Sequence, residues 1–129
     1  MPRKITTHQV NGCNEAIQIK ALDEQPGPGG ASHHYVAYVP HDEFNEEMNA
    51  SLCVYLYFQN GPIKEAGVNG ITHEVLLAIL IDRLEGFQRG PFACADNAEA
   101  LSHLKAAVEV LHRRTKARVA RGVEGTHTV

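Results

Sequence analysis

The sequence predicts an α+β fold, in which an N-terminal antiparallel β-sheet is followed by a C-terminal antiparallel two-helix hairpin. The prediction depends on a change of pattern near Gly61. Before this point, short runs alternate apolar with polar or aromatic residues, as strands do, and after it apolar residues recur at helical spacing. Because 129 residues suit one domain, we expect a single domain over 1–129, with the sheet in 1–60 and a turn-rich loop and the hairpin in 61–129.

Three runs in the first half have the composition of strands: residues 16–22, 34–39 and 51–58. Residues 24–32 (EQPGPGGAS) are expected to form a loop, because proline fixes φ and glycine tolerates positive φ. Residues 41–49 are acidic and fit either a hairpin connection or one helical turn. The three strands are therefore expected to pair in antiparallel fashion.

The first helix is expected after residues 59–70, whose Asn-Gly and Gly-Pro steps favour tight turns. Thr72 is a suitable N-cap, and Glu74 is well placed at the positive end of the helix dipole. Residues 75–81 are apolar on nearly all faces, so we expect them to be buried on several sides. Another subunit is expected to provide part of this burial. The Gly-Pro step at 90–91 should end the helix.

The second helix is expected to begin at residues 94–96 and to continue to Gly122. Acidic residues stand early, at Asp96 and Glu99, and basic residues stand late, an order that matches the helix dipole. The apolar residues that recur at three- and four-residue steps include Leu101, Leu104, Val108 and Leu111.

Charge and composition exclude several classes of protein. The formal net charge is −3 and the pI is about 6.2, so no global positive field draws the chain to DNA, RNA or a membrane surface. The three cysteines are scattered without Cys-X-X-Cys spacing, which argues against a disulfide framework or a zinc site and favours a reducing cytoplasm. No apolar stretch is long enough to span a bilayer, and nothing marks the chain for export.

The strongest candidates for ligand binding are arginines at the end of the second helix. Arg114, Arg118 and Arg121 stand at steps of four and three, so they project from one side, and guanidinium groups match phosphate oxygens in pairs. A diphosphate is the ligand that this spacing favours. The alternative is that these residues only offset the helix dipole and stay solvated.

Other candidates have both a functional and a structural interpretation. Phe87 follows Gly86, which leaves room for a purine to stack on the ring, but it also fits as a core residue at a helix end. Asn97 offers a donor and an acceptor to an adenine edge, but it also fits as a local cap. Lys64 is a candidate contact for a second class of ligand, or a solvated loop lysine.

Neither a metal site nor a catalytic centre is expected. His33, His34 and His41 are close in sequence, but no carboxylate or cysteine recurs at metal-ligand spacing. His112 is suited to acid–base chemistry, yet no nucleophile or oxyanion arrangement accompanies it at a known spacing. No motif of the hydrolases, zinc proteases or nucleotide-dependent enzymes is present, so we expect no cofactor and no enzymatic activity.

From residue 59 onward, the chain resembles the hairpin domain shared by phage Thoeris anti-defence proteins and anti-CBASS cyclic-nucleotide sponges. The added N-terminal sheet makes it more similar to the Thoeris anti-defence 1 type than to the shorter, all-helical anti-CBASS type. The resemblance covers somewhat over half the chain and lies in residues 59–70 (QNGPIKEAGVNG), 84–88 (LEGFQ) followed by 90–92 (GPF), Arg114 and Thr115 with Arg118, and 121–126 (RGVEGT).

The resemblance implies a phage protein in the cytoplasm of the infected bacterium that sequesters an immune signalling nucleotide without cleaving it. The implied ligands are cyclic ADP-ribose isomers with a glycosidic ring closure, and some members of the family also hold cyclic di- or trinucleotides at separate sites between subunits. At the matching positions, Phe87 would stack on adenine, Asn97 would be the polar partner of the base, and Arg114 and Arg118 would bind phosphate.

Helix geometry then predicts a homodimer, with a trimer of dimers left open. Asn97 and Arg114 are seventeen residues apart on one helix, which is about 25 Å, roughly twice the span of such a nucleotide. We therefore expect a composite pocket, in which the Phe87 and Asn97 end of one subunit faces the Arg114 and Arg118 end of its partner. The alternatives are an enzyme that hydrolyses the nucleotide and a small nucleic-acid-binding regulator, and the acidic pI counts against the second.

Overall fold

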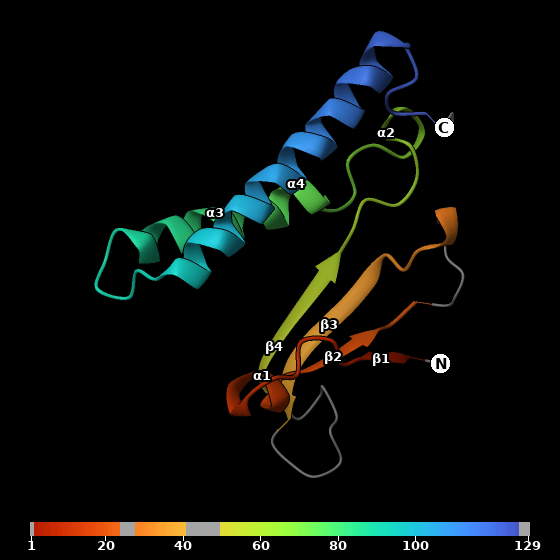
Figure 1. Ribbon diagram of the computed structural model, residues 1–129. Coiled ribbons are helices and arrows are strands. Elements are labelled where there is room, and N and C mark those ends of the chain that lie inside the picture. Colours follow the sequence, from red (N-terminus) through yellow and green to blue (C-terminus); the bar gives the residue numbers. More distant parts are fainter. Residues whose placement is uncertain (1, 24–27, 41–49, 127–129) are drawn as a thin grey trace. The chain divides into compact units, whose positions relative to one another are not determined.

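The computed structural model of the chain describes residues 2–23, 28–40 and 50–126 (Figure 1). It divides the chain into two compact units: one consists of Met1–Gly61 with Val68–Gly70, and the other of Pro62–Gly67 with Ile71–Val129. We call them the sheet unit and the helical unit. An antiparallel sheet precedes the helices, so the α+β fold class is confirmed. That the two units fold as one domain stays a prediction.

Within its described residues, the sheet unit contains four antiparallel strands in the order β1-β2-β3-β4. Each strand pairs with the next along the chain, so short connections are sufficient. The register places Lys20 opposite Val36 and Val36 opposite Tyr55, which gives these residues one face of the sheet. The strands are β1 (Arg3–Ile5), β2 (Gln18–Ala21), β3 (His34–Pro40) and β4 (Ala50–Tyr57).

The core of the sheet unit is small and centres on β3. Ala21, Val36 and Tyr38 are fully buried, with 0% of their surface exposed, and the Lys20 ammonium lies 5.4 Å from the centre of the Tyr38 ring. Asp23 fixes the entry to β3 by accepting hydrogen bonds from the backbone N–H groups of His33 at 2.7 Å and His34 at 3.4 Å. Desolvation raises the pKa of Asp23, but these hydrogen bonds outweigh it and hold the pKa below its ordinary value.

Several sequence-based boundaries in this unit were wrong. The strand predicted over residues 16–22 is shorter, because a five-residue helix, α1 (Gly12–Ala16), comes before it and Asn11 caps that helix through the N–H of Asn14. Strand β1 was not predicted. The predicted loop includes a 3₁₀ turn over Pro28–Gly30, and residues 41–49 lie outside the described residues.

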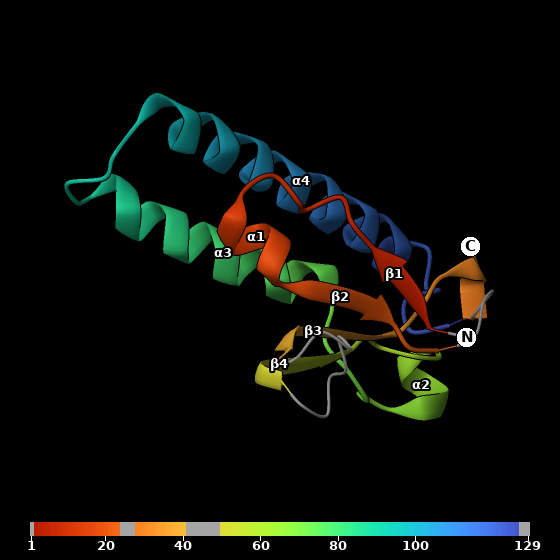
Figure 2. The same cartoon turned by 90° about the horizontal axis from the view of Figure 1, so that it is seen from below.

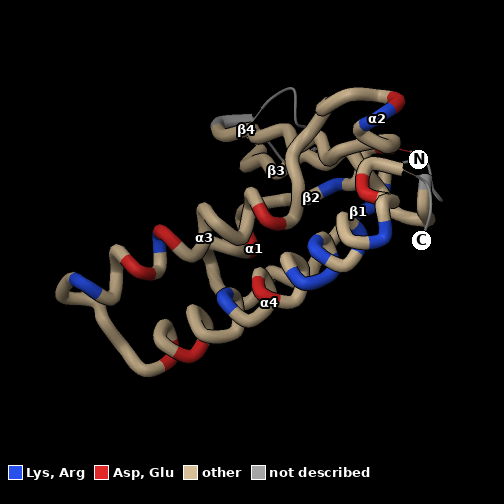
Figure 3. Tube along the Cα trace, turned by 90° about the horizontal axis from the view of Figure 1, so that it is seen from above, with Lys and Arg blue, Asp and Glu red and all other residues tan. Residues whose placement is uncertain are grey.

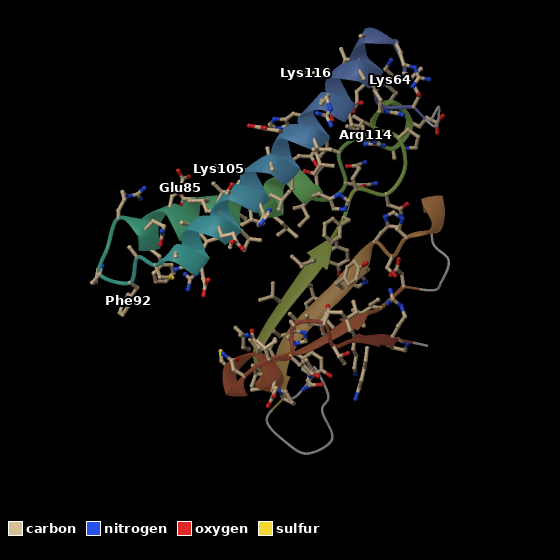
Figure 4. The ribbon with its side chains drawn as sticks, in the orientation of Figure 1. Lys64, Glu85, Phe92, Lys105, Arg114 and Lys116 are labelled. Carbon is tan, nitrogen blue, oxygen red and sulfur yellow. The ribbon has the colours of Figure 1, made fainter. Side chains whose placement is uncertain are left out.

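The helical unit is built on two long helices, α3 (His73–Gln88) and α4 (Ala95–Ala120), which run side by side in opposite directions (Figures 1 and 2). Thr72 caps α3 by accepting a hydrogen bond from the N–H of Val75 at 3.2 Å, as the sequence predicts. An ion pair of 3.6 Å joins Glu85 of α3 to Lys105 of α4 (Figure 4). The predicted helical hairpin is therefore confirmed.

A short helix, α2 (Ile63–Ala66), interrupts the loop predicted over residues 59–70. The two ends of the loop between Asn60 and Asn69 are joined by hydrogen bonds. The Asn69 side chain accepts from the N–H of Asn60 at 2.8 Å and donates to the Asn60 carbonyl at 2.7 Å. Gly70 follows, and a Cβ added there would lie 2.5 Å from the carbonyl carbon of Phe58. Only glycine fits this close approach between backbone segments.

Candidate functional site

The predicted binding residues gather at the two ends of the hairpin. Figure 4 shows Phe92 in the turn between α3 and α4 and Arg114 towards the far end of α4. Phe87 and Asn97 flank the turn, so we call this end the aromatic end. Helix α4 is continuous between the two ends, so the separation of about 25 Å expected from helix geometry holds along it. The basic end comprises Lys64, Arg114, Arg118 and Arg121.

At the aromatic end, Phe87 presents its ring on the surface. It lies in the last turn of α3 and is 36% exposed, so it is not a plug in the core. The guanidinium carbon of Arg83 lies 5.0 Å from the centre of its ring, and the ring of Phe92 lies 6.4 Å away at an interplanar angle of 66°. Arg83 and Phe92 were not predicted as site residues. The four-residue step from Arg83 to Phe87 on one helix was the signal for the first of them.

Asn97 occupies the first turn of α4 and is not its cap. The cap is Cys94, whose sulfur accepts a hydrogen bond from the backbone N–H of Asn97 at 3.4 Å. The amide of Gln88 links the two helix ends, because it donates to the Cys94 carbonyl and accepts from the Cys94 N–H, each at 3.1 Å. This double hydrogen bond fixes the turn that separates Phe87 from Asn97.

At the basic end, Arg118 is committed to the fold. Its side chain is only 13% exposed, and its Nη2 donates to the carbonyls of Val123 at 3.0 Å and Thr126 at 3.2 Å. Its Nε lies 3.4 Å from a carboxylate oxygen of Glu124. Arg118 thus holds the turn after α4, a structural role that the sequence did not indicate. Its predicted role in binding phosphate stays a prediction.

The other basic residues surround this turn. Arg114 is exposed one helical turn before Arg118, and Arg121 is the C-cap residue of α4. Lys64 lies against the turn after α4, since its N–H donates to the Gly125 carbonyl at 3.2 Å and a Cβ on Gly125 would come within 3.2 Å of its Cγ. Figure 3 shows how the cations concentrate in the C-terminal half of α4. Lys64 and Arg118 therefore both contact the turn after α4, at the opposite end of the hairpin from Phe87.

Between the two ends, α3 presents an apolar surface. Both long helices lie entirely within the described residues, and neither contains a buried residue. Ile79 is 58% exposed, and Val75 and Leu80 are also exposed. The burial predicted for residues 75–81 is therefore not supplied within the helical unit, and burial by another subunit stays a prediction. An open cavity of about 400 Å³ is lined by His73, Leu76, Leu77, Leu80 and Leu111.

In the part of the chain that the structure describes, no three His, Cys, Asp or Glu side chains are grouped so that they would hold a metal ion. His41, one of the three histidines considered above, is not among those residues. None of the described helices combines the length and the apolar character needed to cross a membrane.

Comparison with known proteins finds two similarities, both of which include the hairpin. Residues 55–116 match the Acb2/Tad1 hairpin domain, a range that contains Lys64, Phe87, Asn97 and Arg114 but not Arg118. Thoeris anti-defense 1 of Bacillus phage SBSphiJ7 is 49% identical to the chain over 70 residues, which are 54% of this chain and 49% of that protein. The matched region thus spans about half the length of this relative. The hairpin is therefore similar to the Acb2/Tad1 hairpin domain, and about half of the chain is similar to a Thoeris anti-defense 1 protein.

Proposed function

We propose that the protein is a phage anti-defence protein that acts in the cytoplasm of an infected bacterium, where it sequesters a cyclic ADP-ribose isomer with a glycosidic ring closure and does not cleave it. The similarity to Thoeris anti-defense 1 supports the anti-defence role. The observation that carries the binding role is the pairing of an exposed aromatic ring with exposed guanidinium groups on one continuous hairpin. A ring suits an adenine base, and guanidinium suits a diphosphate.

The binding pocket is composite in this proposal. Because Asn97 is about 25 Å along α4 from Arg114, one protomer does not reach both ends of a small nucleotide. Two protomers related by a two-fold axis bring the aromatic end of one against the basic end of the other, and the symmetry produces two equal pockets. Arg114 binds phosphate directly, and Arg118 and Arg121 add positive charge beside it.

The exposed face of α3 is the interface that the proposal requires. Val75, Ile79 and Leu80 are exposed, and the apolar cavity lies beside them. Contact with a second copy removes this surface from water, which stabilises association by about 25 cal/mol for each Å² of apolar area. The same proposal includes further association of these dimers as a trimer of dimers. It also includes a separate site for cyclic di- or trinucleotides near Lys64.

Native mass spectrometry with a panel of cyclic ADP-ribose isomers and cyclic oligonucleotides tests the proposal. We expect a dimer or a multiple of it, with one ADP-ribose isomer for each protomer and the ligand recovered intact after denaturation. A new product peak would instead establish a hydrolase. Affinity for any DNA duplex that falls steeply with salt would establish a nucleic-acid-binding regulator.

Subunit mixing tests the composite pocket. Phe87→Ala and Arg114→Ala each damage both pockets of their own homodimer. In a heterodimer purified through two different tags, one pocket carries both substitutions and the other carries neither. We therefore expect native affinity at half the sites of the heterodimer. Failure to recover any site would show that both residues act within one protomer.

A further inference from the structure

The side chain of Arg83 lies over one face of the Phe87 ring. The guanidinium of Arg83 is 5.0 Å from the ring centre, which is within the range of a cation–π contact. Arg83 stands one helical turn before Phe87 on α3, so this contact needs no other element. Phe87 is still 36% exposed, so part of its ring is accessible to a planar ligand.

Phe92 stands beside the same ring. Its ring centre is 6.4 Å from that of Phe87, and the 66° between the planes is close to an edge-to-face arrangement. Figure 4 shows Phe92 in the turn of the hairpin. At 71% exposure it buries little apolar surface within the chain, so its contribution to the stability of the helical unit is small.

The turn that carries Phe92 is fixed by several hydrogen bonds. Besides the two between Gln88 and Cys94, the N–H of Gly90 donates to the Phe87 carbonyl at 3.1 Å, and the N–H of Ala93 donates to the Gly90 carbonyl at 3.3 Å. An exposed aromatic ring on a fixed turn is arranged for a ligand, because little conformational freedom remains to be lost on binding.

We propose that Phe92 and Arg83 complete a recess for a purine base at the aromatic end. The base stacks on the face of Phe87 opposite the guanidinium, and the ring of Phe92 borders it and contacts its edge. Arg83 is a positioning residue that holds the orientation of Phe87. This inference rests on the proposed nucleotide binding and adds two residues to it.

Titration calorimetry of substituted proteins with a glycosidic cyclic ADP-ribose tests the inference. Phe92→Leu keeps an apolar side chain but removes the ring, and we expect affinity to fall roughly three- to tenfold. Arg83→Ala should weaken binding about two- to fivefold, and Arg83→Lys should restore part of the loss because it keeps the charge. Val10→Ala, which changes an exposed apolar residue of the sheet unit, is the matched control and should leave affinity unchanged.

A fluorescence experiment provides an independent measurement. The chain has no tryptophan, so Phe92→Trp introduces a single indole at the site. Contact with a bound purine should change its emission, whereas inorganic pyrophosphate, which has no base, should leave the emission unchanged. This variant keeps an aromatic ring and so avoids loss of the fold as an explanation.

The outcomes separate this inference from the proposed function. If the wild-type protein binds the nucleotide while Phe92→Leu and Arg83→Ala bind it equally well, or while the indole emission stays constant, the inference is wrong and the proposed function stands. If the wild-type protein binds no nucleotide of the panel, both are overturned.

Discussion

The sheet unit and the helical unit contain similar apolar residues but treat them differently. In β3, Val36 and Tyr38 are fully buried. In α3, the equally apolar Val75, Ile79 and Leu80 lie on the surface. Among the described residues, the strands of the sheet unit bury a small core, whereas α3 and α4 leave an apolar face exposed. The proposed dimer therefore places its second subunit on the helical unit.

The largest expected effect is a loss of stability in the sheet unit. In Gly70→Ala, the added Cβ would meet three backbone atoms between 2.5 and 2.7 Å away, in Tyr57, Phe58 and Gln59. Backbone cannot move aside as a side chain can, so we expect a loss of about 3 kcal/mol or more in the free energy of unfolding. Urea denaturation followed by hydrogen exchange of each unit measures it.

Gly12→Ala is the control for this substitution, because nothing lies within 4 Å of the added Cβ. We expect no loss of stability there. If Gly70→Ala unfolds both units in one transition, the prediction of a single domain is supported, and if α3 and α4 stay protected, it is wrong.

The next largest effect tests whether the exposed apolar face of α3 is a subunit interface. Leu80→Glu places a carboxylate on the exposed apolar face of α3, where the proposed dimer would bury it without a partner. We expect dissociation to monomers and a roughly hundredfold loss of nucleotide affinity, with the sheet unit still folded. Analytical ultracentrifugation and calorimetry measure the two quantities, and Leu80→Met serves as the conservative control. A Leu80→Glu protein that stays dimeric would place the interface elsewhere.

A smaller effect separates two neighbouring arginines of the helical unit. Arg118→Ala removes hydrogen bonds to Val123 and Thr126, and we expect the unit to lose about 2 kcal/mol of stability. Arg114→Ala should leave stability within about 0.5 kcal/mol, because its side chain is on the surface, and should still weaken nucleotide binding. Thermal melts and calorimetry on both variants distinguish a structural from a binding arginine. Equal losses of stability would contradict the distinction.

The smallest effect concerns pH and the sheet unit alone. The pKa of Asp23 is lowered in the fold, so its carboxylate stabilises the folded state fully above its ordinary pKa of 3.8. That contribution is lost as the pH falls from 3.8 through the lower pKa of the folded state. Asp23→Asn should therefore be slightly less stable than the wild type at pH 6, and the difference should shrink in acid. A difference that does not change between pH 6 and pH 2 would contradict this account.

Local signals in the sequence were enough to predict the helices. The cap at Thr72, the Gly-Pro step after α3 and the steps of apolar residues in α4 act within a few residues, and both helices were found nearly to their ends. Strand β1 and helix α2 were missed, since each has four residues or fewer and too short a pattern. The resemblance to the hairpin family is confirmed.

The candidate site was less predictable, because its side chains depend on distant partners. Arg118 has the helical spacing of a phosphate ligand, but its hydrogen bonds to an irregular turn five to eight residues later leave no periodic signal. Phe92 follows a helix stop, where the sequence gives no direction for a side chain. The step of four from Arg83 to Phe87 is the one local signal for their contact, because residues four apart lie on the same side of a helix.

The Asn69 side chain, bonded to both the N–H and the carbonyl of Asn60, has a consequence for how this protein tolerates change. These hydrogen bonds join the two ends of the loop that contains α2. Residues inserted in this loop would lengthen it without separating its ends. The entropy of such a loop grows only with the logarithm of its length. Extra residues or a peptide tag should therefore be tolerated after α2, beside Val68, which is 79% exposed, but not within α2, where Lys64 lies against the turn after α4.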